Sequence, residues 1–166
     1  MRRSMTGLAV LALVMMTGSV AAPAIAASEK RAMPYYGSIG ASRARMRTGP
    51  ARAYPASWNY RRPDLPVKVV AAFKEWRKVQ DPDGTEGWML GVLLRNTRTA
   101  IVRGSEPLPM RSAPSDTAKI LWRAEPGVVG RISECNGGWC RLDVKGQAGF
   151  VPVGAIWGVE PGETLP

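Results

Sequence analysis

Residues 76–90 read Trp-Arg-Lys-Val-Gln-Asp-Pro-Asp-Gly-Thr-Glu-Gly-Trp-Met-Leu, and this stretch decides the fold. Residues 67–73 and 76–80 are rich in β-branched and aromatic side chains, which favour strands. Asp81-Pro82-Asp83-Gly84 has the composition of a tight turn, and residues 87–90 form the next apolar run. The stretch therefore predicts short strands joined by turns.

The same organisation occurs twice along the chain. Three pairs of segments align in one order, at offsets of 64, 63 and 62 residues. They are residues 46–50 with 110–114, 76–77 with 139–140, and 87–89 with 149–151. Such a repeat indicates two tandem units of about 60 residues.

The second unit repeats the strand pattern over residues 128–135, 139–144 and 148–153. The chain has 14 prolines and 18 glycines, and no stretch offers a convincing amphipathic helix. Short strands without helices are typical of small barrels or sandwiches. Because a 60-residue unit buries little surface alone, we predict an all-β fold of two tandem small barrels packed as one body with pseudo-twofold character.

The N-terminal 26 residues resemble a secretory signal peptide. Arg2 and Arg3 make a basic start, residues 7–20 carry no charge, and Ala24-Ile25-Ala26 fits a small-x-small cleavage site. An uncleaved anchor is the alternative, but an apolar run of about 14 residues is short for a bilayer. We therefore expect an exported, periplasmic or secreted protein with a lead-in at 27–34, domains at 35–102 and 103–160, and a tail at 161–166.

The two cysteines of the chain bracket a turn. Cys135 and Cys140 flank Asn-Gly-Gly-Trp, and Asn-Gly between apolar runs predicts a hairpin. In an oxidising compartment the two thiols would pair. A redox-active pair is the alternative, but it normally has Cys-x-x-Cys spacing, so we predict a structural disulfide.

Composition argues against catalysis. The chain has 23 Lys and Arg against 13 Asp and Glu, and it has no histidine. The absence of histidine excludes Ser-His-Asp and Cys-His sites and His-ligated metals. Asp81, Asp83 and Glu86 lack the spacing of a calcium loop and are explained by a turn. We expect no catalytic residue, no cofactor and no metal site.

Several segments resemble a known family. Residues 45–50 (Arg-Met-Arg-Thr-Gly-Pro) are similar to the opening strand of bacterial SH3-like domains, and residues 58–69, 76–88 and 156–163 resemble the alphaproteobacterial branch of exported tandem SH3-like proteins. The resemblance covers about residues 35–163 and implies small SH3-like β-barrels that act as binding modules. The second unit departs from it, because it lacks the Asn-Tyr-Arg-Arg-Pro run and the Asp-Pro-Asp-Gly turn.

Aromatic and arginine side chains are the candidates for ligand binding, since SH3-like barrels bind extended peptides over aromatic grooves. The candidates are Trp58, Tyr60, Arg61, Arg62, Arg77, Trp88 and Trp122. Three other aromatic residues, Trp76, Trp139 and Phe150, are expected to fill the barrel cores, since the repeat keeps their positions.

Charge is concentrated in the first unit. Residues 27–102 carry 14 basic and 6 acidic side chains, whereas residues 103–166 carry 7 of each. The excess includes Arg43, Arg45, Arg47 and Arg52, and a solvated basic face is the plain interpretation. In an exported protein such a patch would attract peptidoglycan carboxylates or, more weakly, anionic lipid, and nucleic acid is not an expected partner.

Two functions therefore remain. The first is a non-catalytic module that recognises cell-wall peptide, or an extended segment of an envelope protein, through an aromatic and arginine groove on the first domain. The second is a structural or regulatory partner of an envelope enzyme or sensor, docking through the second domain or the seam between the domains. The sequence leaves the oligomeric state open.

Overall fold

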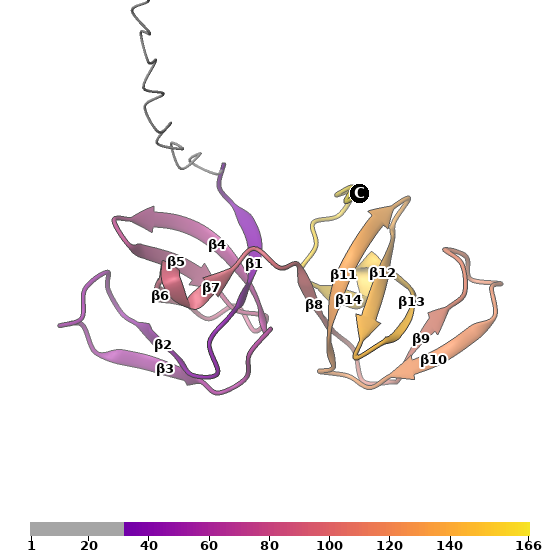
Figure 1. The fold of residues 1–166 in the computed structure, drawn as a ribbon, viewed down its shortest axis with the longest axis horizontal. Helices are drawn as coiled ribbons and strands as arrows, with labels where there is room; N and C mark the ends of the chain where they lie inside the picture. Colours follow the sequence, from indigo (N-terminus) through magenta and orange to yellow (C-terminus); the bar gives the residue numbers. More distant parts are fainter. Residues whose placement is uncertain (1–31) are drawn as a thin grey trace, which may run out of the picture. The chain divides into compact units, whose positions relative to one another are not determined.

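The computed structural model describes residues 32–166, so the expected signal peptide and its cleavage point lie outside the described residues. This part of the chain consists of short β-strands and two 3₁₀ turns, arranged in two seven-stranded antiparallel sheets. The all-β tandem prediction is confirmed (Figure 1). None of the helical turns within residues 32–166 is long and apolar enough to cross a membrane.

The first sheet has the strand order β3-β2-β6-β5-β4-β1-β7. Its strands are β1 (Tyr35–Ile39), β2 (Ala44–Arg47), β3 (Ala56–Tyr60), β4 (Pro66–Phe73), β5 (Trp76–Gln80), β6 (Glu86–Leu90) and β7 (Leu94–Arg95). A 3₁₀ turn, η1 (Gly91–Leu93), joins β6 to β7. The predicted strands at 67–73, 76–80 and 87–90 correspond to β4, β5 and β6.

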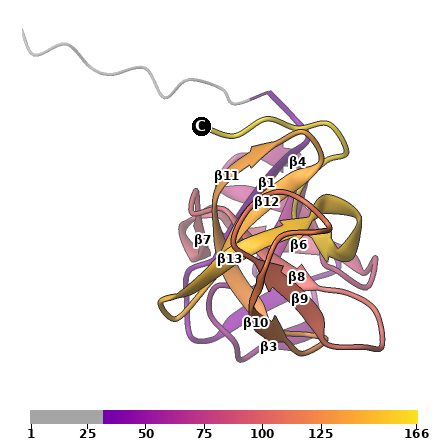
Figure 2. The ribbon, with the colours of Figure 1, turned by 90° about the vertical axis from the view of Figure 1, so that its right-hand side faces the viewer.

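The second sheet has the order β10-β9-β13-β12-β11-β8-β14, which matches the first strand for strand. The second barrel faces the viewer in Figure 2. Its strands are β8 (Thr99–Val102), β9 (Leu108–Arg111), β10 (Ile120–Ala124), β11 (Val129–Asn136), β12 (Trp139–Val144), β13 (Gln147–Pro152) and β14 (Ile156–Trp157). The turn η2 (Val153–Ala155) occupies the place of η1. The repeat therefore reproduces the whole barrel topology.

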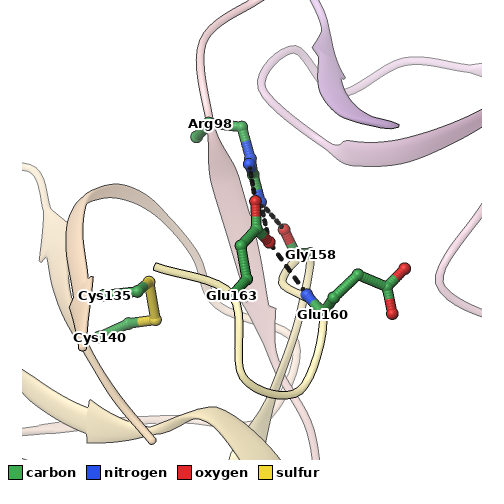
Figure 3. The surroundings of a disulfide bond; sticks show 6 residues. All are labelled: Arg98, Cys135, Cys140, Gly158, Glu160 and Glu163. Carbon is green, nitrogen blue, oxygen red and sulfur yellow. Dashed lines mark hydrogen bonds and ion pairs between the residues drawn. A yellow bond between two sulfur atoms is a disulfide. The ribbon is translucent and has the colours of Figure 1, made fainter. Parts of the chain in front are cut away.

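The sheets divide the chain earlier than the expected boundary after residue 102. Strand β8 pairs with β11 and β14, so residues 99–102 belong to the second barrel. The expected tail is also part of that barrel. The Leu165 and Cys135 backbones exchange two hydrogen bonds, and Glu163 accepts two hydrogen bonds from Arg98, of 2.6 and 2.9 Å (Figure 3).

Each barrel has its own apolar core. Met46, Val67, Val79 and Met89 are fully buried in the first core, and the second is built around equivalent residues. The predicted disulfide is confirmed, because Cys135 and Cys140 are bonded across the β11–β12 hairpin and both are buried in the second core (Figure 3).

Of Trp76, Trp139 and Phe150, which were expected to fill the cores, Trp76 is buried at 4% exposure, whereas Trp139 and Phe150 are only half-buried. All three lie outside both core clusters. The reason is strand register: Val79 points into the core from β5, and alternation along the strand sends Trp76 to the opposite face. In the same way, the buried Cys140 places Trp139 on the outer face of β12.

Side chains of the first barrel also contact the second. Arg62 donates to the Gly127 carbonyl at 3.0 Å, and the rings of Tyr36 and Trp157 meet edge to face at 5.2 Å. Lys68 forms a hydrogen-bonded ion pair with Glu160. The hydrogen bond to Glu160 raises the pKa of the Lys68 ammonium group. Both barrels belong to one compact unit.

Candidate functional site

The outer face of the first barrel gathers basic and aromatic side chains. On β2, Ala44 and Met46 are buried, so Arg45 and Arg47 project to the other face. Arg47 lies opposite Trp88 on β6, and Leu90 of the same strand lies opposite Trp76 on β5. Because paired residues share a face, these side chains cover one surface across three adjacent strands.

A pocket of about 280 Å³ opens on this surface. Its lining consists of four arginines and three apolar side chains, namely Arg43, Arg45, Arg47, Arg52, Trp76, Leu90 and Leu93. Trp76 is only 4% exposed, although it is not part of the central cluster of the first core. The pocket therefore combines one buried and two half-buried apolar side chains with four arginines at its rim.

Among residues 32–166, no acidic side chain lines this pocket. Within residues 32–166, Arg43, Arg45 and Arg52 take part in none of the ion pairs. Guanidinium groups offer a planar fork of donors that matches carboxylate or phosphate. The arrangement therefore suits an anionic group attached to an apolar moiety.

Arg47 differs from the other three arginines because it has a structural partner. Its Nη1 donates to the Tyr54 carbonyl at 2.6 Å, and the Thr48 N–H donates to the Pro55 carbonyl at 3.1 Å. The Tyr54 ring lies so close to Gly49 that a Cβ there would come within 2.5 Å of it. These contacts shape the β2–β3 loop, which carries Arg52 at the pocket rim.

The second barrel builds the same loop without the same charge. Arg111 is the counterpart of Arg47, and its Nη1 donates to the Ala118 carbonyl at 2.8 Å. At the offset of 64 residues, however, Pro107, Pro109 and Asp116 stand in place of Arg43, Arg45 and Arg52. The cationic rim is thus a property of the first barrel alone.

The predicted ligand-binding residues are distributed over several surfaces. Trp88 shares the outer face with the pocket rim through its pairing with Arg47. Arg77 lies on the opposite face of β5, and its Nη1 donates to the carbonyls of Lys74 and Trp76, both at 2.9 Å. Trp88 therefore adjoins the arginine pocket, whereas Arg77 does not.

Tyr60 belongs to the interior of the barrel. It is 7% exposed, and its hydroxyl donates to Asp81 Oδ2 at 2.8 Å. Burial, together with the bond to Asp81, raises the pKa of this hydroxyl above its ordinary value. Its role in the structure is to connect β3 to the turn after β5.

Trp58 and Trp122 occupy equivalent places on β3 and β10, the terminal strands of the two sheets. They are 56% and 42% exposed. Arg61 is exposed, and Arg62 is held by its bond to Gly127. The seven predicted residues therefore do not form one groove.

Sequence reasoning found the basic excess but missed the pocket that organises it. The signal was present in the arginines at alternate positions 43, 45 and 47, since period two places them on one face of a strand. Trp76 could be assigned to this pocket only from the pairing of the strands. Alternation of side chains along a strand defines two faces but does not say which of them points to the core.

The chain belongs to the bacterial SH3 domain family, whose model matches residues 40–95 and 104–158. No curated protein matches the sequence. Two solved structures from Trichomonas vaginalis, NlpC1 and NlpC2, are similar to this chain at 16% and 14% identity, each with a TM-score of 0.34. The match covers 83% of this chain and 50% of NlpC1, and 74% of this chain and 47% of NlpC2. This chain thus spans about half the length of each.

Proposed function

We propose that this protein is a non-catalytic, exported binding module that recognises carboxylate-bearing cell-wall peptide through the arginine-lined pocket of the first barrel. One observation carries the proposal: four arginines and a buried tryptophan line one pocket, and no acidic side chain of residues 32–166 shares it. Membership of the bacterial SH3 domain family supports a binding role. The signal-like N-terminal sequence supports the location.

The chemistry of the pocket matches a short peptide with free carboxylates. Arg43, Arg45 and Arg52 have no acidic partner within residues 32–166, so each guanidinium group can donate a pair of hydrogen bonds to a ligand carboxylate. The half-buried Leu90 and Leu93 offer apolar surface to the aliphatic part of the same ligand. No bond is made or broken, and recognition alone is the activity.

Co-sedimentation of the protein with purified peptidoglycan sacculi tests the proposal. We expect saturable pelleting that weakens with salt, because exposed charges are screened. Arg43→Ala/Arg45→Ala/Arg52→Ala should reduce the apparent affinity at least tenfold and flatten the salt dependence. The melting temperature should stay the same or rise, since the substitution relieves repulsion between like charges.

Two matched variants isolate the cause. Arg61→Ala/Arg95→Ala/Arg123→Ala removes the same charge from exposed positions outside this pocket and should retain binding. Lysine in place of Arg43, Arg45 and Arg52 keeps the charge but removes the forked donors, and it should bind at an intermediate level. Absence of pelleting at low salt, or equal losses in the two triple-alanine variants, would refute the proposal.

One observation favours a second function, docking to a partner protein through the second barrel. Strand β10 exposes Ile120, Leu121 and Trp122, whereas the equivalent strand β3 has Ala56 and Ser57 beside Trp58. Terminal strands with exposed apolar side chains favour association with another chain. A partner that co-purifies from envelope extracts at moderate salt, and is lost with Ile120→Ala/Leu121→Ser, would support it; retention of the partner by that variant would reject it.

A further inference from the structure

The second barrel has a separate hollow that the proposed function does not use. It measures about 800 Å³ and opens over β11, β12 and the β12–β13 turn. Its charged lining includes Arg131, Arg141 and Lys145, and Arg62 reaches it from the loop after β3. None of these residues lines the arginine pocket of the first barrel.

Two acidic residues, Asp64 and Asp143, also line the hollow, so basic side chains outnumber acidic ones there by four to two. Asp143 lies opposite Arg131 in the β11–β12 register, and its Oδ1 accepts the Gly146 N–H at 2.8 Å. Within residues 32–166 neither Arg131 nor Lys145 takes part in an ion pair. Their charges are therefore available to an anion in the hollow.

A buried hydroxyl gives an independent indication of a polar ligand. Thr99 lines the hollow and is 1% exposed, yet its Oγ1 has no hydrogen-bond partner within residues 32–166. Buried hydroxyls in folded proteins are normally paired, because an unpaired one costs stability. A ligand with a hydroxyl or anionic oxygen would satisfy this group.

The turn that carries Lys145 holds this residue at a positive φ, a backbone conformation that asparagine or glycine adopts more easily than lysine. Val144 pairs with Gln147, so Lys145 and Gly146 form a two-residue hairpin loop with φ values of 53° and 89°. Positive φ at both positions is the type I′ pattern, for which Asn-Gly is the preferred sequence. Lysine at such a position is unfavourable, and strain of this kind gathers at functional sites.

We propose that this hollow binds an anionic sugar, with Arg131, Arg141 and Lys145 holding its phosphate or carboxylate. Thr99 and Ser133 supply hydroxyl groups for the sugar's own hydroxyls. The combination of several cations with neutral hydroxyl groups suits a polyhydroxylated anion better than an apolar peptide. A hollow of this volume lies within the range typical of small-molecule sites.

Titration of the mature protein by two-dimensional NMR tests the inference. The probes are glucose 6-phosphate and glucuronate, with glucose and inorganic phosphate as controls. We expect saturable shifts of the amides of residues 129–146 with at least one of the two anionic sugars, at lower concentration than with either control. No saturable shift with either anionic sugar would overturn the inference, and equal binding of inorganic phosphate would overturn the sugar assignment.

Lys145→Asn separates ligand binding from stability. It creates the preferred Asn-Gly turn, so the melting temperature should stay the same or rise, whereas sugar affinity should fall about fivefold to tenfold. Thr99→Val keeps the side-chain shape, and it should also weaken binding without lowering the melting temperature. Unchanged affinity in both variants would overturn the inference. Arg43→Ala/Arg45→Ala/Arg52→Ala should bind the sugar normally, which keeps this result separate from the sacculus experiment.

Discussion

Replacing Tyr60 with phenylalanine removes one hydroxyl from the interior of the first barrel. That hydroxyl donates to Asp81 Oδ2 at 2.8 Å. The other carboxylate oxygen, Oδ1, accepts the N–H groups of Asp83 at 3.0 Å and Thr85 at 2.8 Å. Asp81 is only 6% exposed, so the variant leaves one oxygen of a buried carboxylate without its donor.

The cost follows from the chemistry of that bond. A hydrogen bond to a charged group contributes about 1.5–3 kcal/mol, and a buried acceptor left unpaired lies toward the upper end. For a body of this size, each kcal/mol shifts the melting temperature by about 3–5 °C. Tyr60→Phe should therefore lower the melting temperature at neutral pH by about 5–12 °C.

Alkaline pH should reduce the difference between the two proteins. Burial, together with the bond to Asp81, raises the pKa of the Tyr60 hydroxyl above its ordinary value of 10.0. The stability contributed by the neutral hydroxyl is fully present below pH 10, because neither the folded nor the unfolded chain has lost the proton there. It is lost as pH rises above 10, at up to about 1.4 kcal/mol per pH unit.

Urea unfolding of both proteins between pH 8 and 11 measures this effect. The free energy of unfolding should fall more steeply above pH 10 in the parent than in Tyr60→Phe, so the two curves converge. Tyr54→Phe is the matched control, since Tyr54 is 47% exposed, and it should follow the parent. Parallel curves for the parent and Tyr60→Phe would refute the structural reasoning.

Two further predictions concern the barrel scaffolds. Replacing Cys135 and Cys140 with alanine, or reducing the parent with dithiothreitol, should lower the free energy of unfolding in urea melts. The expected loss is about 2 kcal/mol, because the disulfide closes a short ring. No change on reduction would contradict a stabilising bond. Gly87→Ala should cost about 1–3 kcal/mol by the same measurement, because its Cβ would lie 2.9 Å from a backbone carbonyl oxygen of β2. Gly154→Ala, with open space around it, should be neutral, and equal effects would reject this explanation.

The repeat spacing predicted the tandem barrels, the β-branched and aromatic runs predicted the main strands, and the Asn-Gly turn predicted the disulfide, because all three depend on local pattern and turn chemistry. Other features depend on pairing between distant segments. Residues 99–102 look like the end of the first unit, and only their pairing with β11 assigns them to the second. Leu165 lies in a polar tail whose bridge to Cys135 has no local signal.

The candidate site was harder to predict for the same reason. Trp76 on a strand beside apolar residues looks like a core residue, and nothing local says that Val79 takes that role instead. If the assumed register of a strand is wrong by one residue, every side chain expected in the core is placed on the outer face instead. The prediction of Tyr60 as a ligand residue has the same origin, because its partner Asp81 lies 21 residues away in the sequence.

The duplication itself distinguishes structural from functional side chains, because the two barrels have the same topology but differ in many of their residues. A residue that both barrels keep in the same contact is explained by the fold. Arg47 and Arg111 make the same bond to the β2–β3 or β9–β10 loop, so this arginine is explained by the loop. The loop also closes in both barrels through one backbone bond, from Thr48 to Pro55 and from Ser112 to Lys119. The second barrel achieves this with proline and aspartate in place of the other pocket arginines. Loop formation therefore does not require those arginines. A ligand gives a reason for placing beside one buried tryptophan three arginines that have no ion-pair partner within residues 32–166.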